Sequence, residues 1–360
     1  MKPLLRKLII PFILILLTYG AIEPIIIPGF FPMHDDTQPS RVYEMAQALR
    51  EGQFPVRWVG DLGYGYGYPI FNFYAPLPYY IGAIFYLFGS SAITATKIMF
   101  AIGIILSAVS MFFLVNELIG SLAGIASSLL YLYVPYHAVN IYVRGAVGEY
   151  YAYAFLPFIL LGIILIVKSI KSDGKKNLNK GVLIGSLGYA ATLLSHNILG
   201  MITTYILIIG VILYSLYLVF MKKNKFIFYT LAFTFLIGLC LSSFFILPAA
   251  FEKNYTRIDE LTHGGSDYHQ HFVYIDQLWD SPWGFAGSAP GHTDGMSFKI
   301  GKIHLLTGLI PLIYIFYLYK NKRVTYLQFI IYNFSFIIFI LSIFFMLESS
   351  RYIWESKVAA

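Results

Sequence analysis

Residues 92–116 read AITATKIMFAIGIILSAVSMFFLVN, and Lys97 is the only charged residue in this run. A helix needs about 20 mainly apolar residues to cross a bilayer, so this segment predicts a membrane span. Comparable runs occur at 5–22, 118–135, 150–167, 181–195, 198–220, 226–248, 302–319 and 325–346, with a shorter piece at 77–89. The sequence therefore predicts an all-α polytopic membrane protein with about nine to ten membrane segments.

The composition agrees with this fold class. Hydrophobic residues make up 58% of the 360 residues and charged residues only 12%, whereas a soluble domain carries about 25% charged residues. The net charge of +7 comes from short basic clusters between apolar runs, so it indicates membrane topology rather than nucleic-acid binding. The single cysteine, Cys240, excludes a disulfide framework.

The basic clusters set the expected topology. Short loops rich in Lys and Arg face the cytoplasm, which predicts a cytoplasmic N-terminus in the plasma membrane and an uncleaved first helix. The cytoplasmic segments would be 1–7, 168–180, 221–225 and 320–323, and the outward ones 23–76, 136–150, 196–197, 249–301 and 347–360. An even number of crossings must then separate 23–76 from 136–150. Either 77–89 is re-entrant or half-spanning, or 181–195 does not cross.

Two long outward loops are expected to form a cap on a single transmembrane domain spanning 1–360. In loop 23–76, Val42, Met45, Ala46 and Leu49 fall on one helical face and Arg41, Glu44, Gln47 and Arg50 on the other. This pattern predicts an amphipathic helix on the membrane surface that ends near Gly52. Loop 249–301 is rich in His, Gly, Trp and Asp and predicts an ordered segment.

The first outward loop holds an acidic pair, Asp35 and Asp36, after His34. One carboxylate could act as a general base on an acceptor hydroxyl, or the pair could hold a divalent cation. The alternative is that both residues cap the following helix. His34 would tune the pair or be incidental.

Other polar and aromatic residues gather on the expected outward side. Glycines and tyrosines are interleaved without a strict period in 60–80, which suits either a carbohydrate or polyprenyl-headgroup groove or an interfacial aromatic belt. Arg144 could grip a phosphate or pair with Glu149, and Asn197 could simply form a turn. The candidate substrate-binding side chains are His34, Arg41, Arg57, Tyr66, Tyr68, Tyr74, His137, Arg144, Glu149, His196, Asn197 and Trp279.

The histidines of the second loop, His263, His269, His271 and His292, lack the spacing of known zinc motifs and give only a weak metal signal. No Walker, Rossmann, nucleophile-elbow or kinase motif occurs in the chain, so no nucleotide site is predicted. A glycosyl donor would have to be a lipid carrier that enters from the bilayer.

Several stretches carry a resemblance to known families. An N-terminal helix, an outward loop that opens with an acidic pair and then a surface helix resemble the GT-C fold glycosyltransferases. The segments HDDTQPSRVYEMAQALREGQFPVRW (34–58), GYGYPIFNFYAPLPYY (65–80), PYHAVNIYVRGAVGE (135–149), LLSHN (193–197) and GMSFKIG (295–301) look like a prokaryotic membrane protein family labelled "pyruvoyl-tetrahydropterin synthase-related". Nothing in these residues suggests pterin chemistry.

The GT-C resemblance implies roles for individual residues. Asp35 or Asp36 would take the place of the loop carboxylate that activates the acceptor, and Arg144 and Arg57 would hold a polyprenyl phosphate. Relatives often carry a His shortly after the first Asp, where this chain has Thr37, Gln38 and Pro39. Relatives also continue into further helices, so we expect this chain to be truncated.

The leading hypothesis is a membrane glycosyltransferase that moves a sugar from a polyprenyl-phosphate carrier to a glycan, lipid or protein acceptor on the outward face. The first alternative is a non-catalytic lipid-linked glycan binder or flippase, which would place ionisable residues along a crossing path. The spans are nearly free of charge, which favours chemistry at the surface. A structural assembly subunit would leave Asp35, Arg144 and His196 without a shared cavity.

Overall fold

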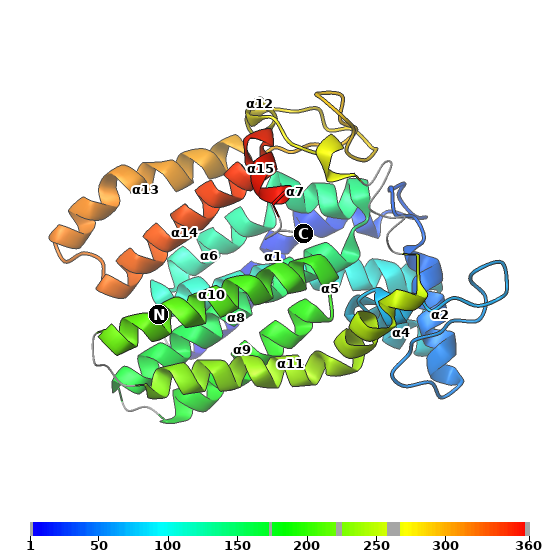
Figure 1. Cartoon of the computed structure of the whole chain (residues 1–360), viewed down its shortest axis with the longest axis horizontal. Helices are drawn as coiled ribbons and strands as arrows, with labels where there is room; N and C mark the ends of the chain where they lie inside the picture. The colour runs from blue at the N-terminus through cyan, green and yellow to red at the C-terminus, as the bar shows by residue number, and fades with distance from the viewer. Residues whose placement is uncertain (1–2, 173–174, 221–224, 258–266, 357–360) are drawn as a thin grey trace. The chain divides into compact units, whose positions relative to one another are not determined.

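The computed structural model describes residues 3–172, 175–220, 225–257 and 267–356. Every regular element in these ranges is a helix, and no strand is present among them (Figure 1). An isolated antiparallel bridge joins Val59 and Tyr68. The prediction of an all-α polytopic membrane protein is confirmed.

Six of the described helices are long and apolar enough to cross a membrane: Ala92–Leu118, Val147–Ile170, Asn197–Ser215, Phe226–Tyr255, Lys302–Lys320 and Gln328–Met346. The count becomes seven if the consecutive segments Ser121–Leu132 and Pro135–Arg144 form one broken span. Two shorter apolar stretches are Phe12–Ile26, which is part of the helix Pro3–Ile26, and the helix Leu77–Leu87. At 11 residues, Leu77–Leu87 rises about 16 Å, roughly half of a bilayer core. The predicted span 181–195 is also not among the candidates, so both alternatives for the topology stay open. Among the described residues, the six or seven candidate spans are fewer than the nine to ten segments predicted.

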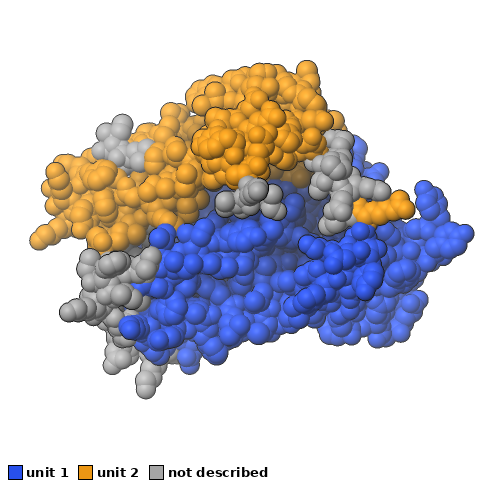
Figure 2. All heavy atoms as spheres, viewed as in Figure 1, with its two compact units in different colours: residues 1–132, 145–256 blue, residues 133–144, 257–360 orange. Residues whose placement is uncertain are grey.

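The chain divides into two compact units (Figure 2). Unit 1 comprises residues 1–132 and 145–256, and unit 2 comprises residues 133–144 and 257–360. The expected cap draws on both units, since loop 23–76 belongs to unit 1 and most of loop 249–301 to unit 2. Each unit is therefore described by itself.

The helices of unit 1 are α1 (Pro3–Ile26), α2 (Gln38–Arg50), α3 (Ile70–Phe73), α4 (Leu77–Leu87), α5 (Ala92–Leu118), α6 (Ser121–Leu132), α8 (Val147–Ser172), α9 (Lys175–Leu193), α10 (Asn197–Phe220) and α11 (Phe226–Glu252). Helix α8 lies at the centre and packs against α5 and α9, while α11 packs against α9. Tyr150 and Tyr151 of α8 are fully buried, as is Phe100 of α5. Unit 1 is thus a helical bundle built around α8.

Helix α2 differs from the predicted surface helix. It begins at Gln38 with Pro39 in its first turn, and Gly52 follows its end with φ +84°, as the sequence predicted. Val42 is fully buried because α2 packs against α4 and α5. Glu44, expected on the solvent side, is only 4% exposed. The predicted period is correct, but protein rather than lipid headgroups covers the apolar face.

The described helices of unit 2 are α7 (Pro135–Ala138), η1 (Val139–Arg144), η5 (Tyr268–Gln270), α12 (Ile275–Trp279), α13 (Lys302–Lys320), α14 (Tyr326–Met346), η6 (Glu348–Ser350) and α15 (Arg351–Trp354). Val139 and Val143 of η1 pack against Met296 in a small core. Only residues 321–325 separate α13 from α14, and the two helices contact each other, so they form a helical hairpin. A capping box between Thr325 and Gln328 starts α14. The amide of Ile300, two residues before α13, donates to the carbonyl of Leu278 in α12, which holds α12 close to the start of α13.

Candidate functional site

The acidic loop of unit 1 is anchored by Gln38, the first residue of α2. The Gln38 side chain is fully buried. Its Nε2 donates to the carbonyl of Gly145 at 2.8 Å, and its Oε1 accepts from the hydroxyl of Tyr79 at 2.7 Å. Gly145 has φ +67°, and a Cβ there would lie 2.3 Å from Met33 Sδ and 3.2 Å from the carbonyl oxygen of Asp35. Residues 33–38 therefore rest directly on the turn before α8, which requires glycine.

Within this loop, His34 and Asp35 form a close pair. His34 Nδ1 lies 2.9 Å from Asp35 Oδ1, and the two side chains are 61% and 35% exposed. Asp36 is exposed. Helix α2 begins after Thr37 and has no side-chain cap, so the carboxylates of Asp35 and Asp36 are not its caps. The pair has the composition of a carboxylate–imidazole acid–base group open to solvent.

His196 lies at the same end of unit 1. Its Nδ1 accepts from the amide of Leu199 at 3.2 Å in the turn that starts α10. A Cβ at Gly148 would lie 2.5 Å from the carbonyl oxygen of Ser195 and 3.6 Å from His196 Cδ2. Because Gly145 contacts Asp35 and Gly148 contacts His196, the start of α8 brings both residues to one region.

Further contacts close this region into one structure, which we call the loop end of unit 1. Asn197 Nδ2 donates to the carbonyl of Phe73 at 2.7 Å, and the amide of Leu77 donates to the carbonyl of Leu194. Asn197 thus joins two segments in addition to forming a turn. The loop end comprises residues 31–38, 53–77, 145–149, 194–197 and 247–252. In Figure 1, α2, α4 and the C-terminal end of α11 gather at this end of the unit.

Arg57 lines a hollow in the loop end. Arg57 Nη1 lies 3.8 Å from Glu252 Oε1, and Glu252 Oε2 accepts from Asn72 Nδ2 at 2.8 Å. The hollow has a volume of about 380 Å³ and is otherwise lined by Ser243, Phe244, Leu247, Pro248 and Phe251. It therefore combines a guanidinium with a largely apolar wall, and Glu252 offsets part of the positive charge.

The side chains of Arg41 and Tyr74 contact each other. The Arg41 guanidinium lies 4.5 Å from the centre of the Tyr74 ring, and its Nη1 donates to Tyr79 Oη at 3.2 Å. The Tyr79 hydroxyl in turn donates to Gln38 Oε1. These three residues position α2 against α4.

The tyrosines of the Gly–Tyr segment project outward. Tyr66 is 89% exposed, and Tyr68, whose backbone pairs with Val59, is also exposed. A Cβ at Gly67 would lie 2.2 Å from Trp58 Nε1. This glycine, with φ +86°, therefore permits the turn to close on Trp58, and it leaves the phenol rings available for stacking.

The remaining candidates are tied into their own units. In unit 2, Arg144 donates to Asn140 Oδ1 at 2.7 Å and to Tyr136 Oη at 3.1 Å. His137 is buried. Trp279, also in unit 2, lies 5.4 Å from Lys302 Nζ. In unit 1, the buried carboxylate of Glu149 accepts from the hydroxyl of Tyr153 at 2.9 Å.

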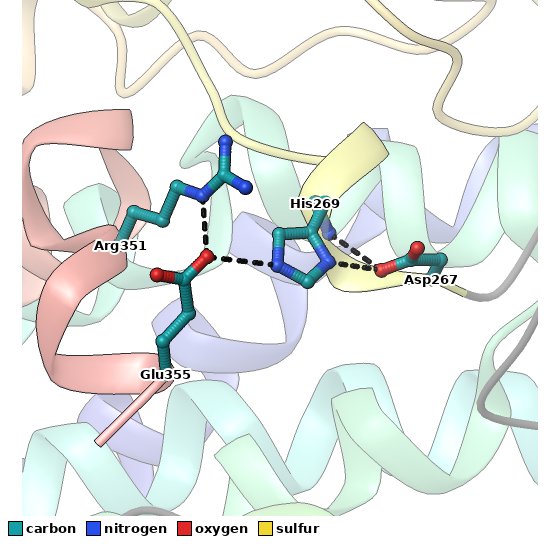
Figure 3. A network of polar contacts seen from close by, with 4 residues as sticks. All are labelled: Asp267, His269, Arg351 and Glu355. Carbon is teal, nitrogen blue, oxygen red and sulfur yellow. Dashed lines mark hydrogen bonds and ion pairs between the residues drawn. The ribbon is translucent and has the colours of Figure 1, made fainter.

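The histidines of the second loop bind carboxylates and hydroxyls. His269 Nδ1 lies 2.6 Å from Asp267 and its Nε2 lies 3.3 Å from Glu355, which also contacts Arg351 (Figure 3). His292 lies 3.3 Å from Asp276, and His271 lies 2.9 Å from Ser288. His263 lies outside the described residues. Among the described residues, no group of three or more His, Cys, Asp or Glu side chains could hold a metal ion.

Comparison with known proteins identifies the family of this chain. Residues 71–263 match the 6-pyruvoyl-tetrahydropterin synthase related domain family, described as membrane proteins. The chain belongs to this family. The match includes Arg144, Glu149, His196 and Asn197, but not Asp35 or Asp36. The family description gives no support for the GT-C resemblance, which stays a hypothesis.

One relative is an uncharacterized protein of Lactococcus lactis subsp. cremoris (strain MG1363), 28% identical over 190 residues. The alignment covers 51% of this chain and 29% of the relative. The chain thus spans less than a third of that relative's length. No solved structure matches this member of the family.

Gln38, Asn72 and Glu252 shape the loop end, yet they were not among the residues expected from sequence. A signal existed for Glu252, because it is a lone carboxylate directly after the apolar run 226–248, and charges at the ends of spans are costly and often functional. Gln38 carries no such signal. Its role depends on Gly145, which lies 107 residues away in the chain.

Proposed function

We propose that this protein is a membrane glycosyltransferase that moves a sugar from a polyprenyl-phosphate carrier to an acceptor hydroxyl at the loop end of unit 1. The observation that carries the proposal is the solvent-exposed His34–Asp35 pair, held on the start of α8 through Gln38. A carboxylate in this setting can accept a proton, and the neighbouring imidazole orients it.

In the proposed reaction, Asp35 takes the proton of the acceptor hydroxyl as its oxygen attacks the anomeric carbon of the sugar. The new glycosidic C–O bond forms while the bond from the anomeric carbon to the phosphate oxygen breaks. The electron pair leaves with the polyprenyl phosphate, and a guanidinium stabilises the added negative charge. Arg57 is our choice for this role in unit 1.

The hollow beside Arg57 supports a lipid-linked donor. Its wall is built largely from Phe244, Leu247, Pro248 and Phe251 of α11, one of the helices with the length and composition of a membrane span. A polyprenyl chain could thus lie against α11 while its phosphate meets Arg57, because a guanidinium pairs well with phosphate oxygens. The exposed rings of Tyr66 and Tyr68 are available to stack on a sugar.

The test is donor turnover by purified protein with matched variants. The purified chain would be given polyprenyl-phosphate glucose, mannose or galactose together with a membrane glycan extract, and release of polyprenyl phosphate would be measured. Asp35→Asn should lower turnover about 10²–10⁴-fold, the usual contribution of a general base. Glu51→Gln, which changes an exposed carboxylate of the same unit outside the loop end, should leave turnover unchanged.

Two outcomes would contradict the proposal. Full transfer by both Asp35→Asn and Asp36→Asn would exclude the mechanism. Binding of a donor by the wild-type chain without any turnover would instead favour the non-catalytic binder.

A further inference from the structure

A second feature lies in unit 2 and does not depend on the proposed transferase activity. A groove of about 270 Å³ runs between α13 and α14. It is lined by Ile300, His304, Leu305, Gly308 and Leu309 on one side and by Tyr332, Ser335, Phe336 and Phe339 on the other. This volume exceeds the apolar cavity of about 150 Å³ that can hold benzene. The groove is therefore large enough for a stretch of hydrocarbon chain.

Gly308 of α13 helps to keep the groove open, because it has no side chain that would occupy the space between the two helices. A Cβ added at Gly308 would meet no atom within 4 Å. The Tyr332 hydroxyl donates to the carbonyl of Gly308 at 2.8 Å, which fixes the two walls relative to each other. Both helices have the length and composition of membrane spans, so bilayer hydrocarbon is the solvent around this groove.

One end of the groove lies next to positive charge. Ile300 and His304 line that end; in the sequence, Lys299 directly precedes Ile300 and Lys302 stands two residues before His304. The first turn of α13 has no acidic residue and no side-chain cap, so the partial positive charge of this helix end adds to the lysines. Asp280 is the competing anion, at 2.8 Å from Lys299 Nζ and 3.7 Å from Lys302 Nζ. Two lysines against one carboxylate leave a net positive charge.

We propose that this groove binds one hydrocarbon chain of an anionic glycerophospholipid whose phosphate lies at Lys299 and Lys302. The apolar walls select the chain, and the excess of positive charge selects an anionic headgroup over a zwitterionic one. The membrane supplies this ligand directly.

The experiment measures lipid retention by native mass spectrometry. The full chain, purified in detergent, would be incubated with phosphatidylglycerol or phosphatidylcholine of identical acyl chains. We expect the wild-type protein to retain phosphatidylglycerol in clear excess over phosphatidylcholine. Equal retention of the two lipids would overturn the proposal.

Matched variants locate the site. Gly308→Leu should fill the groove and lower phosphatidylglycerol retention about tenfold, a loss that corresponds to about 1.4 kcal/mol. Gly210→Leu is the control, because Gly210 of α10 also faces open space but does not line the groove. Equal loss in both variants, or no loss in Gly308→Leu, would place the lipid elsewhere.

Charge variants keep the test valid even if Gly308→Leu folds poorly. Lys299→Gln combined with Lys302→Gln should abolish the preference for phosphatidylglycerol. Asp280→Asn should increase it, because the competing carboxylate is gone. An unchanged preference in both charge variants would exclude these lysines as the headgroup site.

Discussion

At the scale of single residues, Glu44 is the most unusual charged group of α2. Its residue exposure is only 4%, and its Oε2 accepts a long hydrogen bond, 3.4 Å, from the amide of Asp61. Burial raises the pKa of its carboxyl above the ordinary 4.5; the amide of Asp61 offsets part of this rise, and the charges of Asp61 and Glu51 add to it. The ionised form is thus less favourable in the folded chain than in the unfolded one.

This shift predicts how stability depends on pH. Well below pH 4.5 Glu44 is protonated in both the folded and unfolded states, so it favours neither. As pH rises through the raised pKa of the folded state, the unfolded state ionises more readily and the free energy of unfolding falls. Glu44→Gln should therefore gain stability over wild type as pH rises from 4 to 8. Thermal unfolding in detergent across this range would measure the difference, and Glu23→Gln, at an exposed site that does not act on Glu44, should show no such gain. Parallel pH profiles for Glu44→Gln and wild type would contradict the assignment.

At the scale of elements, α8 and α9 meet through glycines. A Cβ at Gly162 of α8 would lie 2.4 Å from the Cα of Gly185 and 2.8 Å from the carbonyl oxygen of Gly181. Both contacts are with backbone atoms, which cannot move away by a change of rotamer. Small residues let membrane helices approach closely, and this face explains why α9 packs so extensively on α8.

The glycine face predicts opposite effects for one substitution at two sites. Gly162→Ala should destabilise unit 1 by about 1–3 kcal/mol through overpacking. Gly210→Ala should be neutral or stabilise the protein by up to about 1 kcal/mol, because its Cβ meets open space and alanine favours helix. Unfolding of both variants in mixed micelles would be compared, and a gain in stability for Gly162→Ala would show that the two helices are further apart.

At the scale of the whole molecule, the sequence predicts helices better than it predicts their partners. Apolar runs such as 92–116 became helices because length and hydrophobicity decide spanning segments locally. The covering of α2 and the Asn72–Glu252 contact depend on residues far along the chain, up to 180 positions apart. Periodicity shows that a face is apolar but does not show whether lipid or protein covers it. The loop end was therefore only partly predictable.

The ends of α11 predict the sidedness of unit 1. Helix α11 has 27 residues and is thus about 40 Å long, enough to cross the bilayer. Its last residue, Glu252, contacts Asn72 and Arg57 of the loop end, whereas Lys225 lies just before its start in a basic cluster. Positive loops stay in the cytoplasm, so the loop end should face outward.

Cysteine labelling tests this orientation in a Cys240→Ala background. Ser40 on α2 and Lys225 are both exposed, and each would be replaced by cysteine in turn. A membrane-impermeant maleimide should label Ser40→Cys in intact cells and Lys225→Cys only after permeabilisation. The reverse pattern would put the His34–Asp35 pair in the cytoplasm and so move the proposed chemistry to the inner face. Labelling of both in intact cells would show that α11 does not separate the two compartments.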